Sequence, residues 1–180
     1  MAKIRIVAGT LRGSKIDVPD APGLRPTPDR VRETLFNWLQ PVIAGARCVD
    51  LYSGSGALGI EAASRGASEV VFVERDRALA RKIEAELARL KVTAARVACE
   101  DAARFLAQPA EPFDVAFVDP PFGAGLWDEA LARLDAGWLA PGAMVYVESP
   151  RGQPIAVPPR WTLHREGHAG EVGFALYRLS

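Results

Sequence analysis

From about residue 46 onward, short apolar segments alternate with segments of helical periodicity, and this alternation limits the fold more than any other feature of the chain. Residues 70–73 (Val-Val-Phe-Val) and 115–118 (Val-Ala-Phe-Val) have no polar face. Such strands are typical of a parallel sheet covered by helices on both sides. With right-handed crossovers, we expect a doubly wound α/β sheet. Strands are expected at 47–52, 69–74, 92–98, 113–119 and 143–148, and helices at 57–65, 76–90, 102–107 and 127–138.

The two ends of the chain depart from this pattern. Residues 161–163 and 172–179 are expected to close the sheet as a pair of strands, with an antiparallel strand at the C-terminus. The first eighteen residues predict a hairpin, which is followed by a proline-rich loop. Thr27 then suits the N-cap of a helix and Pro28 its first position. We therefore expect a hairpin-and-helix extension over 1–43 and an α/β domain over 44–180.

Composition excludes several classes of protein. The 22 basic and 22 acidic residues give a formal net charge of zero, and no apolar stretch approaches the roughly 20 residues of a membrane span. Without a signal-peptide pattern at the N-terminus, we expect a cytoplasmic protein. Cys48 and Cys99 are expected to be buried in strands as small hydrophobes. Only His164 and His168 could join them as metal ligands and no spacing fits, so no metal is expected.

Four carboxylates follow the expected strands at the same point. Asp50, Glu74, Asp101 and Asp119 each lie at or just after a strand end. In an open α/β sheet, ligands bind outside the carboxyl ends of the strands, so the four acids should converge on one edge. The alternative is that some of them cap the helices that follow, and this alternative is strongest for Asp101.

The loop Gly54-Ser55-Gly56-Ala57-Leu58-Gly59 matches the dinucleotide fingerprint, and an acid stands at the ribose-binding spacing. An NAD-linked oxidoreductase is therefore one possibility. Asp50, however, would repel a pyrophosphate placed against this loop. S-adenosylmethionine instead carries a sulfonium and an ammonium, and it has no phosphate. Asp50 could accept the ammonium, Glu74 the ribose hydroxyls and Asp101 the adenine amino group, so we expect S-adenosylmethionine as the cofactor.

The segment Asp119-Pro120-Pro121-Phe122 points to the acceptor of the methyl group. Two prolines fix the backbone and remove two donors, which leaves carbonyls, one carboxylate and an aromatic ring at the sheet edge. Asp119 and the carbonyl of Pro120 could accept both N–H bonds of an amino group on a base, while Phe122 stacks on the base after it has turned out of its helix. Catalysis would come from positioning and electrostatics. The alternative is a rigid turn in which Phe122 covers the core.

These motifs resemble the class I methyltransferases that act on amino groups of bases. More closely, the chain is similar to the RsmD family of 16S ribosomal RNA guanine-N2 methyltransferases, in the segment from Arg25 to Leu39, in the opening Arg5-Ile-Val-Ala-Gly, and nearly end to end. The resemblance implies a Rossmann-like class I methyltransferase fold and methylation of guanine-966 on an assembling small subunit. Tyr52, Ser53 and Glu100 depart from the residues common in that family.

The resemblance also implies site residues. Catalysis falls to Asp119, Pro120, Pro121 and Phe122. Cofactor binding falls to Asp50, Ser53, Gly54, Gly56, Glu74, Arg75, Asp101 and Ala102.

The basic residues near the N-terminus are the candidates for contacts with RNA. Residues 1–15 hold four basic side chains and no acidic one, a modest sign of a polyanion contact. The candidates are Lys3, Arg5, Arg12, Lys15, Arg25, Arg30 and Arg32. Arg30 and Arg32 could face RNA or the cofactor carboxylate, or be ordinary helix-surface charges. The expected partner is 16S rRNA in a small ribosomal subunit or an assembly intermediate, bound by a monomer. A DNA adenine-N6 methyltransferase and a non-catalytic RNA-binding assembly factor remain as alternatives.

Overall fold

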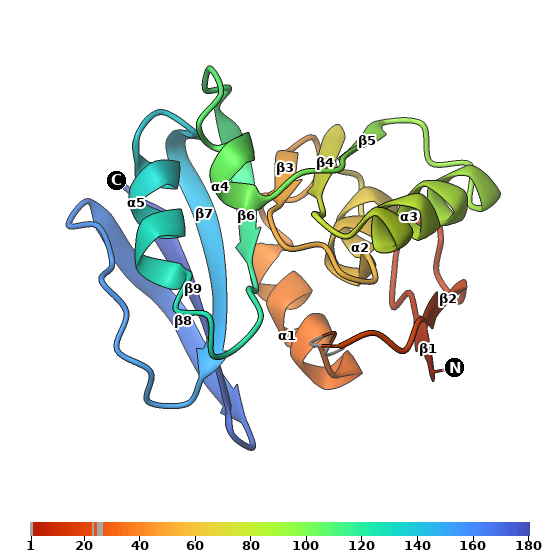
Figure 1. Cartoon of the computed structure of the whole chain (residues 1–180), viewed down its shortest axis with the longest axis horizontal. Coiled ribbons are helices and arrows are strands. Elements are labelled where there is room, and N and C mark those ends of the chain that lie inside the picture. Colours follow the sequence, from red (N-terminus) through yellow and green to blue (C-terminus); the bar gives the residue numbers. More distant parts are fainter. Residues whose placement is uncertain (1, 23, 25–26) are drawn as a thin grey trace.

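The computed structural model describes residues 2–22, 24 and 27–180. In this part of the chain, seven strands form one sheet in the order β5-β4-β3-β6-β7-β9-β8, in which β9 runs antiparallel to both neighbours (Figure 1). The elements are β1 (Ala2–Arg5), β2 (Lys15–Val18), α1 (Asp29–Leu39), β3 (Arg47–Asp50), α2 (Ala57–Ser64), β4 (Glu69–Val73), α3 (Arg77–Arg89), β5 (Ala95–Ala98), α4 (Ala102–Phe105), β6 (Phe113–Val118), α5 (Trp127–Asp135), β7 (Leu139–Pro150), β8 (Trp161–Ala169) and β9 (Val172–Leu179).

Helices cover both faces of the sheet, as the apolar strands predict. One face packs against α1, α2 and α3, with Phe72 and Phe117 in its centre. The other packs against α4 and α5, with Val71 and Val118 in its centre. Because neighbouring residues of a strand face opposite sides, each strand needs apolar residues at both. The predicted α/β fold with its antiparallel strand near the C-terminus is confirmed.

The strand order reverses between β3 and β6. The chain runs outward from β3 through β4 to β5, then crosses back to place β6 on the other side of β3. The carboxyl ends of β3 and β6 therefore lead into loops that diverge, and a crevice opens between them.

The strands β1 and β2 form a separate two-stranded hairpin, which lies near α2 and α3 in Figure 1. Its turn is joined to α2 by hydrogen bonds, in which the Thr10 amide donates to the Ser64 carbonyl over 2.9 Å. Gly9 approaches that carbonyl so closely that a Cβ would lie 1.9 Å from the oxygen. Ile6 and Ile16 belong to the same core as α1. The division at residue 43 stays a prediction.

Several predictions of detail were wrong. The helix α1 has Pro28 as its N-cap and no side-chain cap, because the Thr27 hydroxyl points elsewhere, as described below. Cys48 is buried as predicted, but Cys99 follows the end of β5 and is exposed. The strands β7 and β8 are longer than predicted. β8 pairs with β9 along its length, whereas β7 pairs with β9 from Met144 to Pro150 and begins opposite β6, where Leu139 pairs with Phe113. Among the described residues, no helix combines the length and apolar character that crossing a membrane requires.

Candidate active site

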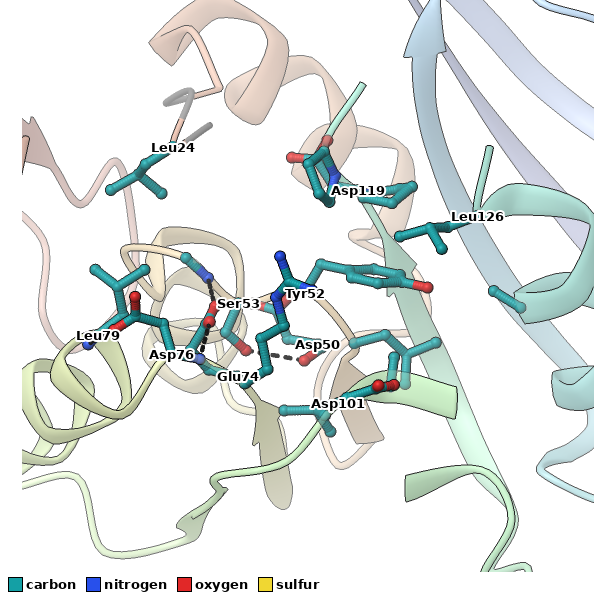
Figure 2. A pocket seen from close by; sticks show the side chains of 18 of the residues that line it. Leu24, Asp50, Tyr52, Ser53, Glu74, Asp76, Leu79, Asp101, Asp119 and Leu126 are labelled. Atoms are coloured by element: carbon teal, nitrogen blue, oxygen red, sulfur yellow. Dashed lines mark hydrogen bonds between the residues drawn. The ribbon is translucent and has the colours of Figure 1, made fainter. Parts of the chain in front are cut away.

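A cavity of about 680 Å³ lies at the carboxyl ends of β3, β4 and β6. Figure 2 shows Asp119 on one side of it, Glu74, Asp76 and Leu79 on the other, and Tyr52 between them. The structure thus brings the four predicted acids to one cavity, whose size suits a nucleoside-sized ligand. The predicted residues that line it are Asp50, Ser53, Gly54, Glu74, Arg75, Asp101, Ala102, Asp119, Pro120, Pro121 and Phe122.

Asp50 ends β3 and is almost fully buried. Its Oδ2 accepts a hydrogen bond from the Gly59 amide over 3.3 Å. Burial raises the pKa of Asp50 to about 7; the Gly59 hydrogen bond opposes this rise, and the charge of Glu74 adds to it. Gly59 can approach because it has no side chain: a Cβ there would lie 2.3 Å from the ring of Phe72. The cavity therefore holds a carboxyl group that gains from any cation brought beside it.

Glu74 follows β4 and fixes the glycine loop. Its Oε1 accepts from the Gly54 amide over 2.9 Å, and its Oε2 accepts from the Asp76 amide over 2.8 Å. A carboxylate has about four acceptor sites, so both oxygens keep capacity for further donors. Gly54 has a φ of +56°, which favours glycine. This end of the loop is thus held by a carboxylate that can also bind hydroxyl groups.

Gly56, predicted to bind the cofactor, lies behind the cavity wall. It is the N-cap of α2 with a φ of +84°, and its amide donates to the Ser53 carbonyl over 2.8 Å. A Cβ at Gly56 would lie 3.3 Å from Ile83. Gly56 therefore forms the turn into α2, and its direct contact with the cofactor stays a prediction.

Asp101 fulfils both readings that the sequence left open. Its Oδ1 caps α4 by accepting from the Ala103 amide over 2.8 Å, and its side chain also lines the cavity. Tyr52, which the sequence prediction omitted, lies near it. Burial raises the pKa of Tyr52 to about 12, and the charges of Asp101 and Glu129 add to the rise. The phenol therefore stays neutral and presents an aromatic surface to the cavity.

Asp119 begins the segment that follows β6. The hydroxyl of Thr27 lies 3.4 Å from its Oδ2. The ring of Phe122 packs 6.0 Å from that of Trp127, and it also lines the cavity. Phe122 therefore belongs to the edge of the core and to the cavity wall at once. The cavity is also lined by residues that the sequence analysis did not predict, among them Thr27, Leu79 and Leu126. These residues belong to no motif that would indicate a binding site.

Most of the predicted RNA-binding residues are exposed, and one is buried. The exposed residues are Lys3, Arg5, Arg12, Lys15 and Arg30. Lys3 also forms an ion pair with Asp17 over 3.2 Å, and this contact lowers the pKa of Asp17. Arg25 lies outside the described residues.

Arg32 is fully buried, so its predicted contact with RNA or cofactor was wrong. Its guanidinium donates to the Arg5 carbonyl and lies 3.5 Å from Glu61, beneath the hairpin. Helical spacing could not reveal this, because the buried partner is 29 residues away on α2.

Comparison with known proteins shows to which family the chain belongs. A family model described as "Conserved hypothetical protein 95" matches residues 4–178. The Escherichia coli K12 protein named "Ribosomal RNA small subunit methyltransferase D" is 53% identical over 179 residues, which are 98% of this chain and 90% of that protein. The chain belongs to this family, the RsmD family. The resemblance seen in the motifs is thereby confirmed.

Two further members agree. The Haemophilus influenzae protein of the same name is 44% identical, over 98% of this chain and 94% of its own. A solved structure described as "Putative methyltransferase yhhF from Escherichia coli" superposes with a TM-score of 0.92 at 49% identity, covering 99% of both chains. The fold of the RsmD family is therefore shared over essentially the whole length.

Proposed function

We propose that this member of the RsmD family transfers a methyl group from S-adenosylmethionine to the exocyclic N2 of a guanine in 16S rRNA. By family resemblance, the target is guanine-966 on an assembling small subunit. We also propose that the protein acts as a monomer. The observation that carries the proposal is the cavity itself, which holds Asp50, Glu74 and Asp101 near the rigid Asp119-Pro120 segment. Its supports are the site geometry and the family, whose relatives are named as rRNA methyltransferases.

The residues of the cavity fit S-adenosylmethionine better than a dinucleotide. The Gly54 amide, which would bind a phosphate, already donates to Glu74. The Gly56 amide likewise donates to Ser53. A pyrophosphate would therefore meet carboxylates where it needs donors. Asp50 would hold the ammonium of S-adenosylmethionine, Glu74 the ribose hydroxyls and Asp101 the adenine amino group. When bound, the cofactor supplies an electrophilic methyl group.

The Asp119 segment would prepare the nucleophile. The guanine amino group is weakly nucleophilic because its lone pair is delocalised into the ring. Asp119 and the Pro120 carbonyl would accept its two N–H bonds and turn the lone pair toward the methyl carbon. The Asp119 carboxylate would stabilise the positive charge that methylation places on the nitrogen, and it would accept the proton that the nitrogen then loses. Phe122 would stack on the base.

The decisive experiment is to incubate the protein with S-[methyl-³H]adenosylmethionine and three acceptors: small ribosomal subunits lacking the modification, naked 16S rRNA and double-stranded DNA. We expect label in RNA only, and mapping of the modified nucleotide should find N2-methylguanine. Label in DNA adenine would support the DNA methyltransferase alternative. No transfer to any acceptor would support the assembly-factor alternative.

The raised pKa of Asp50 predicts how cofactor binding depends on pH. An ammonium needs the ionised carboxylate, and Asp50 in the free protein is protonated below about pH 7. Binding at pH 6 should therefore release a proton, and affinity should rise about tenfold per unit of pH below 7 and then level off. The stability of the protein without cofactor depends on pH in the opposite direction. Because the pKa of Asp50 is higher in the folded than in the unfolded chain, its contribution to the free energy of unfolding is fully present below about pH 4 and is lost as the pH rises through 7.

Calorimetry measures this directly. Titrations with S-adenosylmethionine at pH 6, in two buffers of different ionisation enthalpy, give the number of protons released. Asp50→Asn should release none, and its affinity should vary less with pH. Equal proton counts for the wild type and Asp50→Asn would contradict the assignment.

A further inference from the structure

A second buried carboxylate lies close to Asp119. Glu148, on β7, is 1% exposed. Its Oε2 accepts a hydrogen bond from the Tyr146 hydroxyl over 2.8 Å, and the Thr27 hydroxyl lies 3.2 Å from the same oxygen. Neither Glu148 nor Tyr146 lines the cavity among the described residues. Glu148 therefore stands behind the site, where it can reach the reaction only through another side chain.

Among the described residues, Thr27 lies within reach of both acids. Its hydroxyl lies 3.2 Å from Glu148 Oε2 and 3.4 Å from Asp119 Oδ2, and the residue is 6% exposed. Both distances are long for hydrogen bonds between oxygens, as is common in catalytic sites without substrate. The following Pro28 restricts the backbone of Thr27, and the surrounding residues bury its side chain. One hydroxyl with a single proton thus bridges two carboxylates.

We propose that Glu148 is a positioning residue for methyl transfer, which acts on Asp119 through the hydroxyl of Thr27. This inference rests on the proposed function. The single Thr27 proton is shared between the two carboxylates, with Glu148 as the nearer acceptor and Asp119 Oδ2 as the farther one. This donation fixes Oδ2 of Asp119, so that its other oxygen is left to accept from the target amino group and to take up the proton that the nitrogen loses. No proton moves beyond Asp119, and Thr27 remains the donor throughout.

Neighbouring groups support this direction of the hydrogen bonds. The Tyr146 hydroxyl and Thr27 converge on one oxygen of Glu148, so the carboxylate acts as the shared acceptor. The Glu148 carbonyl also accepts from Trp127 Nε1 over 2.9 Å, which ties this part of β7 to the helix beside Phe122. The bridging unit is thus fixed from both sides.

Thr27→Val is the central test, because valine has nearly the shape of threonine and lacks the hydroxyl. We expect kcat on unmodified small ribosomal subunits to fall about tenfold, the size of one lost orienting hydrogen bond. KM for the subunits and Kd for S-adenosylmethionine should stay unchanged. Thr27→Ser restores the hydroxyl and should restore kcat. Thr162→Val, at an exposed position on β8, is the matched control.

Glu148→Gln tests whether Glu148 is the residue that acts on Asp119 through Thr27. Its kcat should fall to a similar extent, and the double variant with Thr27→Val should be no slower than either single variant, because both remove one coupled unit. Multiplied losses in the double variant, or an unchanged kcat in Thr27→Val, would overturn the inference while the wild type stays active. A wild type that transfers no label would overturn the proposed function and this inference with it. If Glu148→Gln does not fold, the comparison of Thr27→Val with Thr27→Ser decides alone.

Discussion

Asp119→Asn is expected to lose methyl transfer at least about 100-fold while it still binds S-adenosylmethionine, because the change removes the charge at the acceptor and leaves the cofactor side of the cavity intact. Asparagine keeps the shape of the side chain, and its amide oxygen can still accept a hydrogen bond. It cannot take up the proton or oppose the positive charge that develops on nitrogen. The loss should therefore appear in kcat, and Asp119→Ala should be at least as severe.

Two measurements separate this result from a folding defect. Calorimetry should give a Kd for S-adenosylmethionine close to that of the wild type, since the proposed cofactor ligands Asp50 and Glu74 lie at the ends of β3 and β4, away from the substituted residue. Glu84→Gln removes a carboxylate from an exposed position on α3 and should transfer methyl groups normally. Asp119→Asn with wild-type kcat would refute the catalytic role of Asp119.

The fold could be predicted from the sequence because its signals are local. A run such as 70–73 has no polar face, and only a strand covered on both sides accommodates it. Acids placed at the ends of such strands follow the topology of the sheet, so Asp50, Glu74 and Asp119 could be assigned to one edge before any coordinates. Strand ends could not be predicted as well, because pairing with β9 extends β8 beyond its apolar segment, and β7 is extended at its start by β6 and at its end by β9.

The parts that could not be predicted depend on contacts between distant residues. Thr27 resembled a helix cap, and only the fold shows that its hydroxyl lies between Asp119 and Glu148, which are 92 and 121 residues away. Glu148 lies in an apolar strand and has no motif around it. Arg32 resembled a surface charge, because its burial depends on Glu61 of another helix. Local sequence patterns indicate which side of a helix or strand a residue occupies. They do not indicate which residues of other elements pack against that side.

Glu61 is the residue on which the N-terminal hairpin depends most. It is fully buried in α2, and its two oxygens accept from the amides of Val7 and Ala8 over 2.9 and 3.2 Å. Arg65 donates to Oε2 over 2.9 Å, and the buried Arg32 lies 3.5 Å from Oε1. One carboxylate thus neutralises buried cationic groups and also satisfies two backbone donors of the hairpin.

Glu61→Ala should lower the free energy of unfolding by about 3–5 kcal/mol, because it leaves two hairpin amides without their acceptor and removes one of the two carboxylates beside the buried Arg32 guanidinium. Glu84→Ala removes the same side chain from an exposed site on α3, and it should change stability by less than about 0.5 kcal/mol. Urea unfolding measures both changes, and hydrogen exchange should show faster exchange at Val7 and Ala8 in Glu61→Ala. If the two variants proved equally stable, the carboxylate would not be what holds the hairpin against α2. Because a drop of this size is a large fraction of a typical domain's stability, the buried charge is needed both to keep the chain folded and to present the exposed Lys3 and Lys15 from a fixed position.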